Sequence, residues 1–314
     1  MAATEPAAGL PTTTPASGPP AGNGDTPAGL GLALAVYLLW GALPLYLKMI
    51  SHIPPMEVVA HRVLWSLPIA AAALLLRGRM GEIWGLIRQP RKVGMALATA
   101  SLITVNWLVY VYAIGSGHTV EAALGYYINP LISVVIAFVV LKEELRPAQV
   151  VAIGLAVIAV AILAWDAGGL PWISLTLATT WGFYALFRKT LPLGPNQGFF
   201  LEVLILAVPA LGYVLYLEFG GEGHFIAQAG LNDPWLLAFA GVATAVPLMI
   251  YANAAKLLRL STIGIMQYIA PSFVFLIAVF IFKEPFGSTK LIAFCFIWAA
   301  LVVYSVSMYR GRRG

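Results

Sequence analysis

Ionisable side chains interrupt the apolar segments of this chain at a few positions, and these are its first candidates for chemistry. His61 and Arg62 lie together in the stretch AHRVLWS, and Glu202 lies in a later apolar segment. Ionisable groups are costly in hydrocarbon, so each is a candidate for function. We interpret Arg62 as the binder of a ligand carboxylate or phosphate, or as the partner of a glutamate. The alternative is a guanidinium that reaches the interface along its aliphatic stem.

Three groups are candidates for carrying a proton: His61, Glu202 and Glu121. An imidazole changes its charge near neutral pH. Burial favours the uncharged form of a carboxyl group, which brings its proton exchange closer to neutrality. The alternatives are a hydrogen-bonded structural histidine and interfacial carboxylates, which the N-termini of helices favour.

Polar and aromatic side chains in the same apolar segments could line a binding cavity. With His61 and Arg62, the candidate binding residues are Asn106, Tyr110, Tyr126, Tyr127, Asn129, Tyr251, Asn253, Gln267 and Tyr268. One shift of 141 residues relates Tyr110 to Tyr251 and Tyr127 to Tyr268. Symmetric placement suits a central site, so these two pairs are the strongest candidates. The alternative for each tyrosine is an interfacial belt.

Several kinds of site are missing from the sequence. It contains no GxxxxGK[ST] loop for ATP hydrolysis and no HExxH or GxSxG motif of a protease or esterase. The single cysteine, Cys295, can form neither an internal disulfide nor a cysteine-based metal cluster. The basic residues are scattered over short loops and form no stripe for nucleic acid. We therefore expect no enzyme, no cofactor, no metal and no nucleic-acid partner.

The composition places these residues in a bilayer. Of 314 residues, 61% are hydrophobic and only 10% are charged, and the mean hydropathy is +0.88. A soluble domain of this size could not cover so much apolar surface. We predict an all-α integral membrane protein with ten transmembrane helices, at about 30–50, 57–76, 93–114, 119–141, 147–165, 171–189, 198–218, 235–256, 261–282 and 289–309.

The chain carries one long stretch twice. Glu121–Leu145, EAALGYYINPLISVVIAFVVLKEEL, corresponds to Thr262–Phe286, TIGIMQYIAPSFVFLIAVFIFKEPF. The same shift of 141 residues also relates Trp40-Gly41 to Trp181-Gly182. A constant offset through apolar runs, loops and charged stops indicates an internal duplication. In each copy, a proline in the first half predicts a kink or a locally unpaired carbonyl.

The loop charges predict the orientation of the duplicated halves. With the N-terminus in the cytoplasm, the inner loops and tails hold fourteen Lys and Arg residues and the outer loops hold three: Lys48, Lys283 and Lys290. The positive-inside rule therefore predicts that both termini are cytoplasmic. Each repeat contains five spans, an odd number, so the second repeat enters the membrane from the opposite face. Inverted repeats of this kind are typical of secondary transporters.

The predicted organisation has four parts. Residues 1–28 are rich in Ala, Pro, Thr and Gly and are predicted to be a disordered cytoplasmic tail. Residues 29–167 and 168–309 form the two five-helix repeats, and residues 310–314 form a basic cytoplasmic tail. The fifth and tenth spans are nearly all apolar, with small residues suited to helix packing. We assign them to a scaffold or to a homodimer contact.

The chain resembles the drug/metabolite transporter superfamily, whose members carry two EamA-type five-helix repeats. Within it the chain is most similar to the RarD, or chloramphenicol-sensitive, permeases. The similarity is carried by AHRVLWS at 60–66, NWLVYVYA at 106–113, EAALGYYINPL at 121–131, PWISLTLATTWGFYALFRK at 171–189 and IGIMQYIAPSFVFLIAVFIFKEPF at 263–286. The resemblance implies a plasma-membrane permease in which spans 1–4 and 6–9 surround a cavity and spans 5 and 10 lie outside it.

The sequence thus predicts a secondary transporter or exporter of small organic solutes or drugs, working by alternating access and coupled to protons. Two alternatives remain open. One is a flippase for a lipid or a lipid-linked metabolite, and the other is a membrane scaffold or regulator that transports nothing. A saturable flux of a solute would exclude the scaffold.

Overall fold

The computed structural model describes residues 25–310 except 143 and 191–192, and these residues form helices and turns without a strand. The all-α prediction is therefore confirmed for the described part of the chain. The helices are α1 (Pro27–Met49), α2 (Pro55–Leu75), α3 (Met80–Ile87), α4 (Pro90–Gly115), α5 (Thr119–Leu141), α6 (Pro147–Ala167), α7 (Trp172–Thr190), α8 (Pro195–Gly220), α9 (Asp233–Leu257), α10 (Leu260–Met266), α11 (Ile269–Leu276), the π-helix η1 (Ile277–Ile281) and α12 (Ser288–Arg310).

Proline marks the start of most of the long helices. It occupies the first or second position of α1, α2, α4, α6, α8 and α9. The first turn of a helix has no intrahelical partner for its N–H groups, so proline loses nothing there and its φ angle suits the helix. The helices therefore begin within a few residues of the predicted spans.

The first helix starts earlier than expected. Residues 25–28, predicted to belong to the disordered tail, are ordered: the Thr26 hydroxyl accepts from the N–H of Gly29 at 3.0 Å. The Asp25 carboxylate accepts from the N–H of Arg259 at 2.8 Å and from the hydroxyl of Thr262 at 2.7 Å. These bonds hold the pKa of Asp25 below its ordinary value. The prediction was wrong for these four residues, because their partners lie in the other half of the chain. Residues 1–24 and 311–314 lie outside the described residues.

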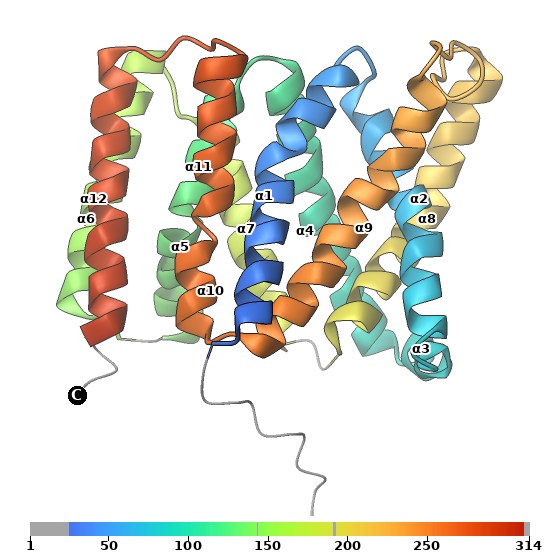
Figure 1. The fold of residues 1–314 in the computed structure, drawn as a ribbon, viewed down its shortest axis with the longest axis horizontal. Coiled ribbons are helices and arrows are strands. Elements are labelled where there is room, and N and C mark those ends of the chain that lie inside the picture. Colours follow the sequence, from blue (N-terminus) through green and yellow to red (C-terminus); the bar gives the residue numbers. More distant parts are fainter. Residues whose placement is uncertain (1–24, 143, 191–192, 311–314) are drawn as a thin grey trace, which may run out of the picture.

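Nine segments of the described chain are long and apolar enough to cross a membrane. They cover every predicted span except the sixth. Helix α7 forms at the residues of the sixth span, but its sequence, WISLTLATTWGFYALFRKT, is more polar. Figure 1 shows α7 in the middle of the helix layer. The protein is thus a multi-pass membrane protein, and the count of ten spans stays a prediction.

The two copies of the repeated stretch differ at their proline. Helix α5 continues through Pro130. In the second copy the helix breaks at Gln267 and Tyr268, between α10 and α11, just before Pro271. Pro271 cannot donate to the carbonyl of Gln267, which accounts for a break at this place. The predicted kink is therefore a break in one copy only.

The ends of the two copies agree closely. Lys142 and Lys283 adopt left-handed backbone conformations, with φ of 58° and 55°, and no other non-glycine residue in the described chain has a positive φ. A left-handed residue commonly ends a helix, but glycine usually takes that place. The same unusual conformation at equivalent positions is what a duplicated unit predicts.

The main packing contacts between helices have counterparts between the equivalent helices of the other half. Helix α1 packs on α9 and on α11, as α7 packs on α4 and on α5, while α2 packs on α8 and α6 on α12. Figure 1 shows α6 and α12 side by side at one edge of the molecule, away from α2, α8 and α9. The start of α1 and the end of α12 lie at the same membrane face. This pairing is what two equivalent five-helix halves predict.

Candidate functional site

A central cavity of about 560 Å³ lies between the two halves. Its lining residues come from α1, α2, α4, α5, α7, α8, α9, α11 and the α10–α11 break, and none comes from α6 or α12. The expectation that spans 1–4 and 6–9 surround the cavity is confirmed. A cavity of this size between helix bundles suits a small organic molecule.

The cavity collects most, but not all, of the predicted site residues. Those that line it are Arg62, Asn106, Tyr110, Tyr126, Asn129, Glu202, Tyr251 and Gln267. Those that do not line it are His61, Glu121, Tyr127, Asn253 and Tyr268. Their roles in binding or coupling stay predictions.

Arg62 is the main buried charge of the cavity. The residue is only 5% exposed, and its Nε donates to the hydroxyl of Thr244 at 3.0 Å. The guanidinium carbon lies 4.7 Å from the centre of the Trp107 ring. Its Nη1 is buried without a hydrogen-bond partner, and no carboxylate of the described residues is within ion-pair distance of it. A desolvated cation with spare donors is a site for an anionic group.

Comparison with known proteins supplies the family. The profile of the EamA-like transporter family matches residues 27–165. Protein RarD of Streptomyces exfoliatus is 42% identical over 285 residues, which cover 91% of this chain and 90% of that protein. The chain belongs to the EamA-like transporter family, in its RarD group.

Other relatives agree over the same length. An uncharacterized transporter of Pseudomonas aeruginosa is 41% identical, covering 91% of this chain and 95% of that protein. Protein RarD of Escherichia coli is 37% identical, covering 92% and 98%. A solved crystal structure shares the fold with a TM-score of 0.58 at 20% identity, covering 90% of this chain and 98% of that one. This EamA-family protein is therefore a membrane transporter.

Polar residues on one wall of the cavity hold each other in place. Asn106 donates through Nδ2 to the carbonyl of Leu177 at 3.0 Å and to the hydroxyl of Thr180 at 2.9 Å. Its Oδ1 accepts from the hydroxyl of Tyr126 at 3.2 Å, and the Tyr110 and Tyr126 rings meet edge to face at 5.5 Å. Asn106 thus uses its donors and its acceptor to orient the aromatic wall.

Arg188 is a cavity residue that the sequence analysis missed. It was counted among the positive charges of an inner loop, but it lies on α7 and lines the cavity. Its Nη1 lies 3.5 Å from Oε1 of Glu202, and the hydroxyl of Tyr184 donates to Oε2 of Glu202 at 3.2 Å. Helical spacing was the available signal, because Trp181, Tyr184 and Arg188 share one face of α7.

Tyr127 and Tyr268 form a pair, but away from the central cavity. Their rings stack at 6.5 Å, and the Tyr127 hydroxyl shares a hydrogen bond with that of Ser272 at 2.7 Å. Both line a separate, mostly apolar groove of about 580 Å³ beside Trp298 of α12. The groove and the cavity have no lining residue in common.

The remaining predicted residues have local contacts. The His61 ring is buried and stacks on Phe225 at 5.0 Å, with both ring nitrogens unpartnered. Asn253 donates to the carbonyl of Met249 in its own helix at 2.9 Å. Glu121 lies half-buried in the first turn of α5. This position fits the alternative interpretation of Glu121, an interfacial carboxylate at the N-terminus of a helix.

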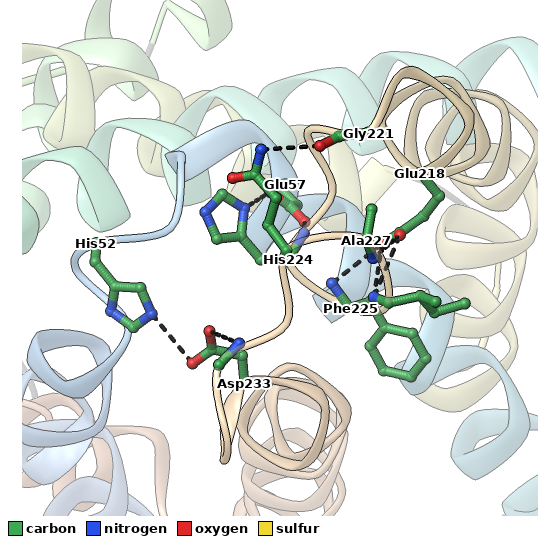
Figure 2. Close-up of polar contacts among 11 residues, drawn as sticks. His52, Glu57, Glu218, Gly221, His224, Phe225, Ala227 and Asp233 are labelled. Carbon is green, nitrogen blue, oxygen red and sulfur yellow. Dashed lines mark hydrogen bonds and ion pairs between the residues drawn. The ribbon is translucent and has the colours of Figure 1, made fainter.

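A polar network joins the two halves (Figure 2), at the face of the molecule where Figure 1 shows the α1–α2 and α8–α9 connections. Glu57 accepts from the N–H of His224 at 2.6 Å and from its Nδ1 at 2.8 Å. His52 pairs with Asp233 at 3.1 Å. Glu218 accepts from the N–H groups of the loop after His224. No residue of this network lines the cavity, so the network lies outside the cavity lining.

Glu57→Gln is expected to lower the melting temperature of the transporter. Both contacts of the buried Glu57 carboxylate are with donors, and an amide offers only one acceptor oxygen. The amide oxygen keeps the bond from the N–H of His224, while the bond at Nδ1 is either lost or requires the ring proton to move to Nε2. The charge-assisted bond to the carboxylate disappears in both cases, which costs about 1–3 kcal/mol. Thermal unfolding in detergent measures the shift. Glu222→Gln is the control, because Glu222 is exposed in the same loop. Equal shifts in the two variants would contradict the role of the network.

Proposed function

We propose that this protein is a secondary active transporter of small organic solutes that carry an anionic group. The observation that supports it is the buried Arg62 guanidinium, which lines the central cavity with one nitrogen unpartnered. An anion that reaches this guanidinium would supply the missing acceptor and charge. Aromatic side chains around it, including Trp107 and Tyr110, would cover the apolar part of the solute.

We infer that the described conformation faces the predicted cytoplasmic side. The lining residues include Pro195 and Asn196 at the start of α8 and Ala255 near the end of α9. These positions belong to one membrane face, whereas the network of Glu57 and His224 seals the other. Alternating access then requires the network to open. At the opposite face, the end of α7, the start of α8 and the end of α9 must move together and close the cavity. The proposal takes the orientation of the chain from the positive-inside rule, with both termini in the cytoplasm.

Glu202 is the proton-coupling residue of the proposal. Among the three candidates, only Glu202 lines the cavity. Its side chain is 2% exposed, and two of its neighbours, Arg188 and Tyr184, also line the cavity. A carboxyl group at this place can exchange a proton with the same water that brings the solute.

Flux into proteoliposomes tests the proposal. Purified protein would be reconstituted and assayed with amphenicols, amino acids, nucleosides and aromatic anions, with and without an imposed pH gradient. We expect saturable flux of at least one anionic solute that responds to the gradient. Saturable flux that ignores the gradient would contradict proton coupling, and the absence of any saturable flux would contradict transport of these solutes.

A lipid flippase remains the second candidate, and the groove lined by Tyr127 and Tyr268 favours it. The groove is mostly apolar and includes the exposed Leu276 and Val302, so an acyl chain could enter it from the bilayer. Its separation from the charged cavity argues against a single lipid that uses both. A fluorescent-lipid scrambling assay in the same vesicles distinguishes the two candidates.

A homodimer through α6 and α12 also stays a proposal. The two helices pack on each other and expose valines such as Val150, Val157 and Val302 to the surroundings. Small residues on α6 would allow close approach of a second copy.

A further inference from the structure

Arg188 is held loosely between two acceptors at the cytoplasmic end of the cavity. Its Nη2 donates to the carbonyl of Pro195 at 3.0 Å. Its Nη1 lies 3.5 Å from Oε1 of Glu202, beyond the range of a charge-assisted hydrogen bond. Oε1 itself has no hydrogen bond. The pair is therefore an ion pair without a tight bond.

Glycine at position 198 makes room for this guanidinium. A Cβ atom on Gly198 would overlap Nη1 of Arg188. The guanidinium therefore packs directly against the backbone of α8. The Arg188 side chain is 18% exposed and the Glu202 side chain 2%. The cation thus faces the cavity, and the carboxylate lies behind it.

Few other polar or charged groups face Glu202. Tyr184 donates to Oε2 from α7, and Thr99 of α4 is a further polar neighbour. Among the ion pairs of the described chain, Glu202 takes part only in the one with Arg188. The ionised state of Glu202 therefore depends on Arg188.

We propose that Arg188 is a second anion subsite of the cavity, which Glu202 occupies when no solute is bound. A solute anion that binds Arg188 displaces the carboxylate. Glu202 is then a buried carboxylate without a cation, and burial favours its uncharged form. It takes up one proton from the cavity water. Anion and proton are therefore bound together and cross the membrane in the same direction.

The charges balance in this exchange. The empty cavity holds Arg62, Arg188 and an ionised Glu202. A monoanion and a proton add no net charge, so the loaded and empty cavities carry the same charge. Flux of a monoanion should respond to a pH gradient and not to membrane potential. The inference deepens the proposed function and rests on it, since it names proton symport of an organic anion.

Calorimetric titration of the purified full chain tests the linkage without a transport assay. The probe is benzenesulfonate, an aromatic monoanion that stays ionised, and benzenesulfonamide is the neutral control. Titration in two buffers of different ionisation enthalpy measures the protons taken up with each anion. We expect about one proton for each anion bound at Arg188, and an affinity of that site that rises about tenfold for each unit by which pH falls.

Three variants separate the roles. Glu202→Gln should bind the anion at Arg188 without proton uptake and without pH dependence. Arg188→Gln should bind it at Arg62 alone, again without proton uptake, whereas Arg62→Gln should keep the proton uptake that accompanies binding at Arg188. Melting curves check that each variant folds. Anion binding without proton uptake in the wild type, or uptake that persists in Glu202→Gln, would overturn the inference while leaving the transporter proposal standing. If benzenesulfonate does not bind to the wild type, the proposal that the solutes carry an anionic group is wrong. Flux of an uncharged solute would then test whether the protein is a transporter.

Discussion

Arg62→Gln is expected to reduce transport of an anionic solute by a factor of roughly 30 to 5000. The guanidinium is buried and lacks a carboxylate partner, so its interaction with an anion would be strongly desolvated. Removing one member of such a pair costs about 2–5 kcal/mol of binding free energy. Initial rates of saturable flux in proteoliposomes measure the loss.

The fold should tolerate this substitution. Nη1 of Arg62 is already unpartnered, so glutamine removes a buried charge that the described chain does not neutralise. Glutamine can keep a hydrogen bond to Thr244. We expect an unchanged or higher melting temperature. Arg88→Gln is the matched control, because Arg88 is exposed after α3; unchanged flux in Arg62→Gln would refute an anion site at this residue.

Gly241→Ala is expected to destabilise the protein strongly. Gly241 of α9 is buried against α2, and a Cβ atom there would overlap the backbone carbonyl group and Cβ of Trp65. A backbone cannot rotate away as the end of a side chain can, so the two helices must separate. Overpacking of this kind costs about 1–3 kcal/mol, and a backbone clash lies at the upper end. The melting temperature and the folded yield in detergent report the loss.

Gly154→Ala provides the matched control for this test. Gly154 is also a helical glycine within a span, but it is exposed and a Cβ atom there meets nothing within 4 Å. Alanine at this position should leave the melting temperature unchanged or slightly higher. A loss of stability as large as that of Gly241→Ala would mean that glycine itself, and not the close approach of α2 and α9, explains the effect.

The sequence contained enough information for the class of protein and its helices. The duplicated stretch, the apolar runs and the prolines at helix starts are local patterns, and the helices follow them within a few residues. The intramembrane positions of Arg62 and Glu202 also carried their own signal, since ionisable groups are rare in hydrocarbon. Both line the cavity.

The choice among aromatic residues was less successful, for a geometric reason. Tyr110 and Tyr251 line the cavity, whereas Tyr127 and Tyr268 line the groove beside α12, although a single shift relates both pairs. Internal symmetry requires equivalent residues to have equivalent surroundings. It does not say whether those surroundings are the central cavity or the contact with the fifth and tenth spans.

The membrane class and the presence of ionisable residues within apolar segments can be read from the chain alone, because hydropathy and residue type are local properties. That Arg188 of α7 lies beside Glu202 of α8 within one cavity, and that Glu57 of α2 accepts from His224 of the α8–α9 loop, is visible only in the folded molecule. These contacts depend on how each helix is rotated about its axis. The rotation is set by close approaches such as that of Gly241 to Trp65, which join residues far apart in the chain.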